Sequence, residues 1–253
     1  MLSIAIAIAA GLIIGSFLNV CIVRLPADES IVAPRSHCRS CKEPLAWYDN
    51  VPLLGWAALR GRCRHCSAPI SLRYPLVEAV TAGLFAVLVT HGFPARELFL
   101  YLALVSALIV ITFIDFDHFI IPDAITLPSI LVAPAFAFAV GHVSVTDSAL
   151  GIVVGGGILW SVAALYERIR KQEGMGFGDV KLLAMIGGFQ GWVGALFALL
   201  VAAVLGSVVG VAVITARRGR LDSAIPFGPF LTGGSLVYLL WGPELIDWYF
   251  GLR

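Results

Sequence analysis

Long apolar runs with almost no charged residues dominate the chain and alternate with shorter polar connections. An apolar run of roughly 17–25 residues is long enough to cross a bilayer as a helix. Eight such runs are expected as membrane segments, near residues 2–22, 75–95, 98–114, 124–141, 148–166, 182–191, 193–216 and 225–243. The sixth is short and contains Gly187, Gly188 and Gly191, so it either enters the membrane partway or joins the seventh across a sharp turn. The pattern predicts an all-α polytopic membrane protein.

The first run has no basic segment before it and continues past its small residues to Arg24. A cleaved signal peptide has a basic n-region, a shorter apolar core and a small-residue cleavage site. We therefore expect this run to be retained as a membrane anchor. Gly15 and Ser16 are small enough for close helix packing, and Asn19 can hydrogen-bond a neighbouring helix.

Composition supports the membrane assignment. Of the 253 residues, 59% are hydrophobic and 13% are charged, with a mean hydropathy of +0.94. A soluble domain of this length carries about twice that share of charged residues. The net charge is +1 and no basic tract is present, so the sequence excludes nucleic acid as an expected partner.

Basic residues are distributed very unevenly between the two sides of the predicted helices. The loops 24–73, 167–181 and 217–220 hold every Lys and Arg except Arg96 and Arg253. These loops are alternate connections, so they share one side of the membrane if all eight segments cross. Because cytoplasmic loops carry an excess of Lys and Arg, this side is predicted to be cytoplasmic.

The 24–73 loop contains two CxxC pairs, Cys38 with Cys41 and Cys63 with Cys66, separated by 21 residues. Two such pairs can place four thiolates around one tetrahedral zinc ion, although the separation is slightly longer than usual. Two disulfides are the alternative, but the predicted location in the reducing cytoplasm disfavours them. A segment this short also needs a cross-link to fold. We predict a small cytoplasmic loop domain held by structural zinc.

Two acidic residues lie at predicted cytoplasmic ends of membrane segments. Asp115 closes the third run, and Asp179 follows the glycine-rich stretch that begins at Gly174. Two neighbouring carboxylates can share a proton and activate water for peptide hydrolysis. The alternative is proton relay or cation binding in a transporter. Hydrolysis is favoured, because transport acids are expected near the middle of the membrane and a transporter has little use for a zinc-bound loop.

Other acidic residues have less specific interpretations. Asp123 follows Pro122 at the start of the fourth run, where capping of the helix is favoured over catalysis. Asp117 is expected nearer to solvent than Asp115. Glu78, one turn inside the second run, is either a packed interfacial acid or a functional group.

Gly176-Phe177-Gly178-Asp179 resembles the GxGD motif of intramembrane aspartyl proteases. Further segments resemble, in the same order, the bacterial type IV prepilin peptidase family. They are Gly15-Ser16-Phe17-Leu18-Asn19-Val20, Arg24-Leu25-Pro26, the paired CxxC loop, Arg60-Gly61-Arg62-Cys63, Arg73-Tyr74-Pro75-Leu76-Val77-Glu78 and Ile114-Asp115. The resemblance covers nearly the whole chain.

The resemblance implies a bifunctional enzyme of the bacterial inner membrane with its catalytic face in the cytoplasm. Such an enzyme cuts the basic leader from type IV prepilins and type II secretion pseudopilins. It then N-methylates the new terminal residue with S-adenosylmethionine. No glycine-rich fingerprint for that donor on a βαβ unit is present, so methyl transfer rests on the resemblance alone and a peptidase without it is the alternative.

The resemblance also implies roles for individual residues. The catalytic pair would be Asp115 and Asp179, and the zinc ligands would be Cys38, Cys41, Cys63 and Cys66. Gly61 falls in the Arg-Gly element associated with methyl transfer. Substrate-contacting or supporting residues are expected at Gly176, Gly178, Lys181, Pro226 and Gly228. The expected organisation is a first helix over 1–23, a cytoplasmic zinc domain over 24–73 and a transmembrane protease domain over 74–253.

Overall fold

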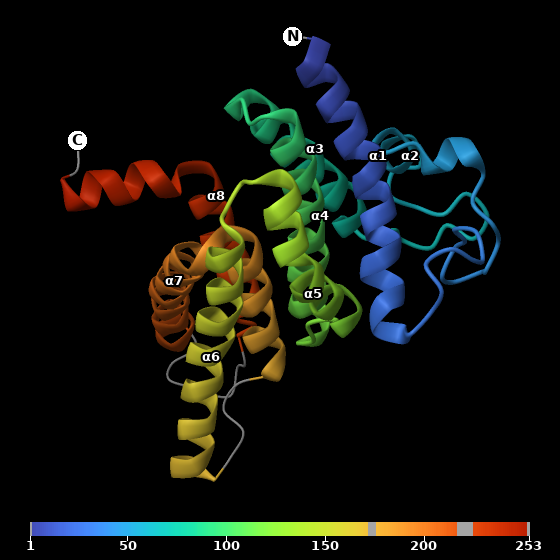
Figure 1. The fold of residues 1–253 in the computed structure, drawn as a ribbon. Helices are drawn as coiled ribbons and strands as arrows, with labels where there is room; N and C mark the ends of the chain where they lie inside the picture. The colour runs from blue at the N-terminus through green and yellow to red at the C-terminus, as the bar shows by residue number, and fades with distance from the viewer. Residues whose placement is uncertain (1, 172–175, 217–224, 252–253) are drawn as a thin grey trace. The chain divides into compact units, whose positions relative to one another are not determined.

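The computed structural model describes residues 2–171, 176–216 and 225–251, and within them the fold is all helical (Figure 1). The α-helices are α1 Leu2–Arg24, α2 Leu54–Ala58, α3 Arg73–His91, α4 Ala95–His118, α5 Asp123–Val140, α6 Val145–Arg170, α7 Phe177–Ala216 and α8 Gly228–Phe250. Two short 3-10 helices, η1 Leu25–Ala27 and η2 Trp47–Asn50, flank the loop between α1 and α2. The described residues form no strand, only two isolated β-bridges.

Among the described residues, six helices are long and apolar enough to cross a membrane: α1, α3, α4, α5, α6 and α7. The multi-pass prediction is therefore confirmed. Helix α7 is 40 residues long and combines the sixth and seventh predicted runs. Its backbone is non-helical at Gly191, where φ is 75° and ψ is 175°, so of the two alternatives the structure supports the one in which the runs join across a sharp turn. The eighth run forms α8, which is not among the six and whose hydropathy is lowered by glycines, Pro243 and Glu244.

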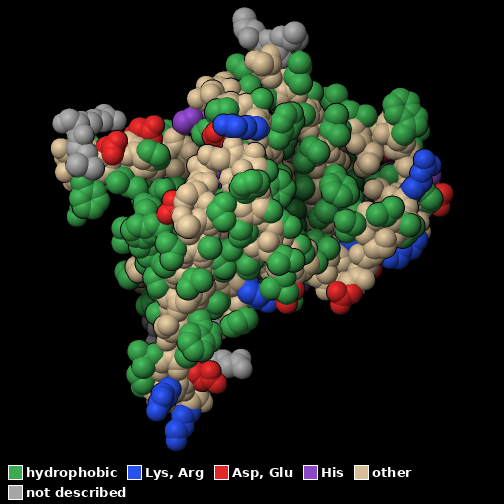
Figure 2. Space-filling view, viewed as in Figure 1, with side chains coloured by type: hydrophobic (Ala, Val, Ile, Leu, Met, Phe, Trp, Pro, Cys, Tyr) green, Lys and Arg blue, Asp and Glu red, His purple; other side chains and the backbone are tan. Residues whose placement is uncertain are grey.

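Large apolar side chains are exposed on the outer faces of the helices, as expected for contact with lipid. On α5, Leu131 and Phe138 are 80% and 83% exposed, and on α6 Val153 is 69% exposed. Figure 2 shows hydrophobic side chains over much of the visible surface, with Lys and Arg gathered at the C-terminal end of α6. Exposed apolar surface of this extent marks a membrane interface.

The chain forms two compact units, Met1–Val110 and Ile111–Arg253. In the first, α1 packs closely on α3. The two backbones approach so closely at Gly15 that an added Cβ would lie only 2.7 Å from the Glu78 Cα atom. Asn19 donates from Nδ2 to the Tyr74 carbonyl over 3.0 Å, the helix-to-helix bond that its position predicted.

Glu78 is buried and accepts a 2.8 Å hydrogen bond from the Leu53 amide. Of its two interpretations, the structure supports the packed acid.

In the second unit α7 packs against α5, α6 and α8. The contact between α6 and α7 is backbone to backbone at Gly151 and Gly187. A Cβ at Gly151 would lie 2.0 Å from the Gly187 carbonyl oxygen, and one at Gly187 would lie 2.1 Å from that of Gly151. One turn farther along α6, a Cβ at Gly155 would lie 2.6 Å from the Leu183 carbonyl oxygen. The central helix α7 is thereby held at close range, with its first turn carrying Asp179.

Candidate active site and metal centre

The four cysteines of the first unit lie on two similar turns. In each turn the first cysteine's amide donates to a backbone carbonyl five residues later, from Cys38 to Glu43 and from Cys63 to Ala68. In each, the residue after the second cysteine has a positive φ, 62° at Lys42 and 57° at Ser67. Each turn therefore presents both of its thiols to one side, the geometry of a zinc knuckle.

The two turns bring all four sulfur atoms within 4.8 Å of one another. The Sγ–Sγ distances are 3.7 Å between Cys38 and Cys66 and 4.0 Å between Cys41 and Cys63. A tetrahedral site with Zn–S bonds of about 2.3 Å has S–S edges of about 3.8 Å, so the cluster fits one such ion. A disulfide needs about 2.05 Å, and all four thiols are free. These cysteines are positioned to bind a metal ion.

The surroundings of Cys38 favour the thiolate that a metal requires. Hydrogen bonds from the backbone N–H groups of Cys41 and Ser40 lower the pKa of the Cys38 thiol, whereas hydrogen bonds with the other three thiols contribute to a raised pKa at Cys41, so Cys38 ionises before Cys41. The fifth cysteine, Cys21, is buried in α1 and lies outside the cluster. Such burial is typical of a free cysteine that packs as a small apolar residue.

Asp115 lies in the last turn of α4 and its side chain is 5% exposed. Its Oδ2 atom accepts a 3.0 Å hydrogen bond from the amide of Gly228, the first residue of α8. A Cβ at Gly228 would lie 2.6 Å from that oxygen, so only glycine allows this approach. The N-terminal end of α8, which carries a partial positive charge, therefore faces the Asp115 carboxylate.

Asp179 lies in the first turn of α7 and is half-buried. Within the described residues its carboxylate has no hydrogen-bond partner, and it is close enough to Asp115 for the two charges to interact. Ile121 lies between the two helix starts. A Cβ at Gly178 would be 2.9 Å from the Ile121 Cβ, and a Cβ at Gly228 would be 3.4 Å from the Ile121 Cδ1 atom. The structure thus brings the two predicted acids, Gly178 and Gly228 together.

The structure corrects the expected role of Asp123 as a helix cap. It is the first residue of α5, no side chain caps that helix, and its carboxylate forms an ion pair with the Lys181 ammonium. The capping interpretation is wrong because a cationic partner on α7 is within reach of the carboxylate. The pair links α5 to the first turn of α7, two residues after Asp179. Asp117 is exposed, as predicted.

The other positions predicted to contact or support the substrate add less to the geometry of the site. Gly176 is exposed, and a Cβ there would meet only the Gly178 amide, at 3.9 Å. Pro226 is half-buried in the irregular stretch before α8. Gly174, the start of the glycine-rich stretch, lies outside the described residues. Ile121 was missed by the sequence analysis, because an isoleucine after an apolar helix carries no signal of its own.

Gly61 has a defined structural reason to be glycine. Its φ is 65°, and a Cβ would lie 2.8 Å from the indole ring of Trp56. The Gly61 carbonyl accepts from the Ile70 amide at 2.7 Å, and the Trp56 indole donates to the Ile70 carbonyl at 3.1 Å. This arrangement joins the end of α2 to the second knuckle.

Two family models match the chain, one described as the bacterial peptidase A24 N-terminal domain over residues 9–92 and one as the type IV leader peptidase family over residues 102–211. Three similar proteins bear the name prepilin leader peptidase/N-methyltransferase. The Aeromonas hydrophila protein is 38% identical over 94% of this chain and 90% of its own length. The Pseudomonas putida protein is 36% identical over 96% and 92%, and the Myxococcus xanthus protein 45% identical over 83% and 63%. No solved structure matches the chain.

Proposed function

The chain belongs to the type IV leader peptidase family, and from that premise we propose that it is a membrane aspartyl endopeptidase that cleaves prepilin leaders and N-methylates the product. Its substrates are type IV prepilins and type II secretion pseudopilins. The observation that carries the peptidase is the meeting of Asp115 and Asp179, on the ends of α4 and α7, with the start of α8. The four-cysteine cluster binds structural zinc, which holds the 24–73 segment.

Asp115 and Asp179 act as a dyad. Two adjacent carboxylates cannot both ionise without repulsion, so one proton is shared between them. The ionised member removes a proton from water, whose oxygen attacks the scissile carbonyl carbon. The protonated member hydrogen-bonds the carbonyl oxygen and stabilises the charge that develops on it. Breakdown of the tetrahedral intermediate returns a proton to the leaving amine and releases the leader.

The location of the dyad suits this substrate class. A prepilin has a basic leader followed by a membrane helix, so its scissile bond lies at the membrane interface. We place the dyad at the cytoplasmic face of the bacterial inner membrane, the side to which the Lys and Arg distribution assigns it. Gly176 leaves space for an extended substrate next to Asp179, while Gly178, which packs on Ile121, supports the surrounding backbone together with Lys181 and Pro226.

Methyl transfer uses S-adenosylmethionine, which supplies an electrophilic methyl group to the new N-terminal amine. We assign the turn at Gly61 to this activity, on the resemblance of Arg60-Gly61-Arg62 to the family's Arg-Gly element alone. The rival function is a peptidase that lacks methyl transfer.

The dyad is tested by Asp115→Asn and Asp179→Asn in membranes, with prepilin as the substrate. Each variant should insert normally and cleave at least about 10²–10⁴-fold more slowly, since general acid–base catalysis contributes a factor of that size. Asp117→Asn, on the same helix but exposed, is the matched control and should cleave at the rate of the unaltered protein. Near-normal cleavage by either dyad variant rejects the assignment.

Mass spectrometry of the product with and without S-adenosylmethionine tests the second activity. A gain of one methyl group only when the donor is present supports the bifunctional enzyme. Leader removal without methylation supports the rival.

A further inference from the structure

The first unit exposes large apolar side chains on the segment that leads into α2. Trp47 is 82% exposed and Leu54 is 68% exposed. Both belong to one packed element, because η2 lies directly against α2. A Cβ at Gly55 of α2 would lie 2.1 Å from the Asp49 carbonyl oxygen of η2. We call residues 47–54, from the start of η2 to the start of α2, the apolar loop.

The apolar loop is attached to the side of α3. The Leu53 amide donates to the buried Glu78 carboxylate over 2.8 Å, and Leu53 has a φ of 59°. A leucine rarely adopts such a backbone conformation, so the contact with Glu78 holds the chain in an otherwise unfavourable turn. Leu54 is the next residue, and its exposed side chain therefore lies close to the level of Glu78.

The lengths of α1 and α3, both apolar enough to cross a membrane, give the depth of this contact. Glu78 is five residues after Arg73, the first residue of α3, which is about 7 Å along the helix. On α1 the position level with Glu78 is Gly15, nine residues and about 13 Å before Arg24 at the end of that helix. The apolar loop therefore lies level with the membrane-spanning parts of both helices.

The segment before the first knuckle lies at a different level. Arg24, at the end of α1, donates to the carbonyls of Ser30 and Pro34, at 2.8 and 2.7 Å. Val32, between them, is 87% exposed, but it is held near the end of α1 and not near Gly15. Val32 and Leu54 are thus two exposed apolar positions of one unit at different depths.

We propose that the apolar loop inserts into the lipid interface at the N-terminal end of α3. Trp47, Tyr48 and Leu54 contact the headgroups and upper acyl chains, and Glu78 holds the loop at that depth. Trp and Tyr are enriched at this level of a membrane, and interfacial segments lie about 5–10 Å into the headgroup and acyl boundary. The inference goes beyond the proposed catalysis and rests only on the membrane assignment.

The exposed surface of α3 and the charge of the first unit favour lipid as the occupant. Leu76 and Val80, before and after Glu78 in α3, are also exposed, so the loop continues the lipid-facing side of a membrane helix. The 24–73 segment carries eight Lys and Arg against four Asp and Glu, an excess that anionic headgroups attract. The alternative occupant is an apolar helix of a partner protein.

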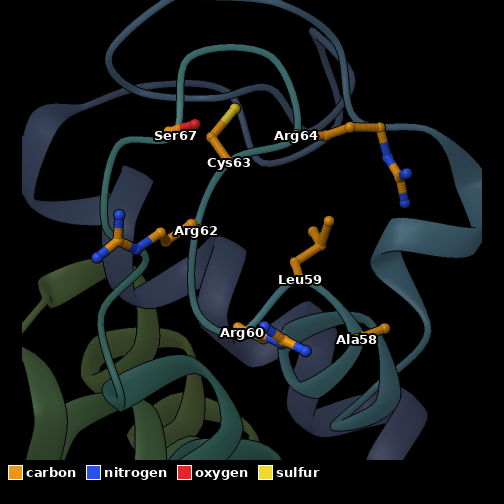
Figure 3. A pocket seen from close by; sticks show the side chains of 7 residues that line it. All are labelled: Ala58, Leu59, Arg60, Arg62, Cys63, Arg64 and Ser67. Atoms are coloured by element: carbon orange, nitrogen blue, oxygen red, sulfur yellow. The ribbon is translucent and has the colours of Figure 1, made fainter.

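Insertion of the apolar loop would also fix the second knuckle at the membrane surface. Arg64 of that knuckle donates to both oxygens of Asp49 in η2, at 3.0 and 2.5 Å, and its guanidinium lies over the Tyr48 ring. Figure 3 shows the Arg64 side chain extending away from Cys63 and Ser67. The ion pair therefore joins the four-cysteine cluster to the inserted loop.

The test places the photoreactive residue p-benzoylphenylalanine at single positions of the full-length, zinc-loaded protein in vesicles of phosphatidylethanolamine and phosphatidylglycerol. It replaces Trp47, Leu54 or, as the equally exposed control, Val32. After illumination, mass spectrometry measures the adducts. The yield of lipid adducts at positions 47 and 54 should exceed that at 32 about tenfold or more, because burial of one such side chain favours insertion by at least that factor.

The role of Glu78 is tested with the probe at position 54. Glu78→Ala should lower the yield of lipid adducts while zinc is retained, because the Leu53 amide loses its acceptor. Glu78→Gln should restore the yield, since its amide oxygen still accepts that hydrogen bond. An unchanged yield in Glu78→Ala overturns the role of Glu78 in setting the depth.

Equal yields of lipid adducts at positions 54 and 32 in zinc-loaded protein overturn the insertion itself. It is also overturned if added prepilin converts the adducts at 54 from lipid to prepilin, since the loop would then be a docking surface for the substrate. Lipid adducts at 47 and 54 that persist with prepilin present support the bilayer as the occupant.

Discussion

At the scale of single residues, the site depends on the absence of a side chain as much as on the carboxylates. Asp115 is held by the amide of Gly228, and a β-carbon at that glycine would lie 2.6 Å from the carboxylate oxygen. Gly178 is in a similar position beside Ile121, because a β-carbon added there would lie 2.9 Å from the Ile121 Cβ. The glycines allow the ends of α4, α7 and α8 to approach closely enough for two acids to share one site.

Gly228→Ala should reduce prepilin cleavage about a hundredfold, because a shift of about 1 Å in a catalytic group can cost that much. The measurement is the initial rate of leader release by the purified variant. Gly233→Ala, on the same helix with no atom within 4 Å of the added carbon, should cleave normally. Equal rates for the two variants would show that Asp115 does not depend on the start of α8.

At the scale of helices, the contact of α6 with α7 sets the position of the helix that carries Asp179. The two backbones meet at Gly151 and Gly187, where neither position has room for a β-carbon. Close approach of this kind is how small residues stabilise helix pairs in a membrane. Farther along α7, Gly191 breaks the helix with a φ of 75°, which ends the segment that packs on Gly151.

Gly151→Ala should lower the free energy of unfolding by about 1–3 kcal/mol, the usual cost of overpacking. The measurement is reversible unfolding in mixed detergent micelles. Gly157→Ala serves as the control on the same helix, because its added carbon meets nothing within 4 Å and alanine favours the helix. A Gly151→Ala protein as stable as the Gly157→Ala protein would contradict the backbone contact.

At the scale of the whole molecule, two compact units carry separate parts of the proposed chemistry. The four clustered cysteines and Gly61 belong to residues 1–110, and the two aspartates belong to residues 111–253. Each unit has its own helix contacts, α1 with α3 in one and α7 with α5, α6 and α8 in the other. Loss of the metal should therefore affect the first unit selectively.

Cys38→Ser, or treatment with a strong chelator, should remove one zinc ion per chain and increase hydrogen exchange over residues 25–72. Exchange in α6 and α7 should remain slow, since their packing involves no cysteine. Exchange measured by mass spectrometry, with metal analysis on the same samples, provides the check. Zinc-free protein with a protected loop, or equal loss of protection in both units, would contradict this division.

Some features of this structure could be predicted from the sequence and others could not, and the difference has physical reasons. The cysteine pairs were predictable, since two CxxC turns each place their thiols on one side whatever the rest of the fold. The bond from Asn19 to the next helix was predictable because a polar amide in an apolar run needs a partner. Asp123 was predicted wrongly as a cap, because its actual partner, Lys181, is 58 residues away in the chain.

Local hydropathy and local spacing determined by themselves that this is a helical, multi-pass membrane protein with a four-cysteine cluster, because those properties depend on neighbouring residues. Only the tertiary structure decided that the Gly228 amide holds Asp115, 113 residues away, and that Ile121 lies beside both Gly178 and Gly228. It also decided that Arg64 pairs with Asp49, 15 residues away in the chain. Such contacts join segments far apart in the chain, and their energies depend on how whole helices and loops pack.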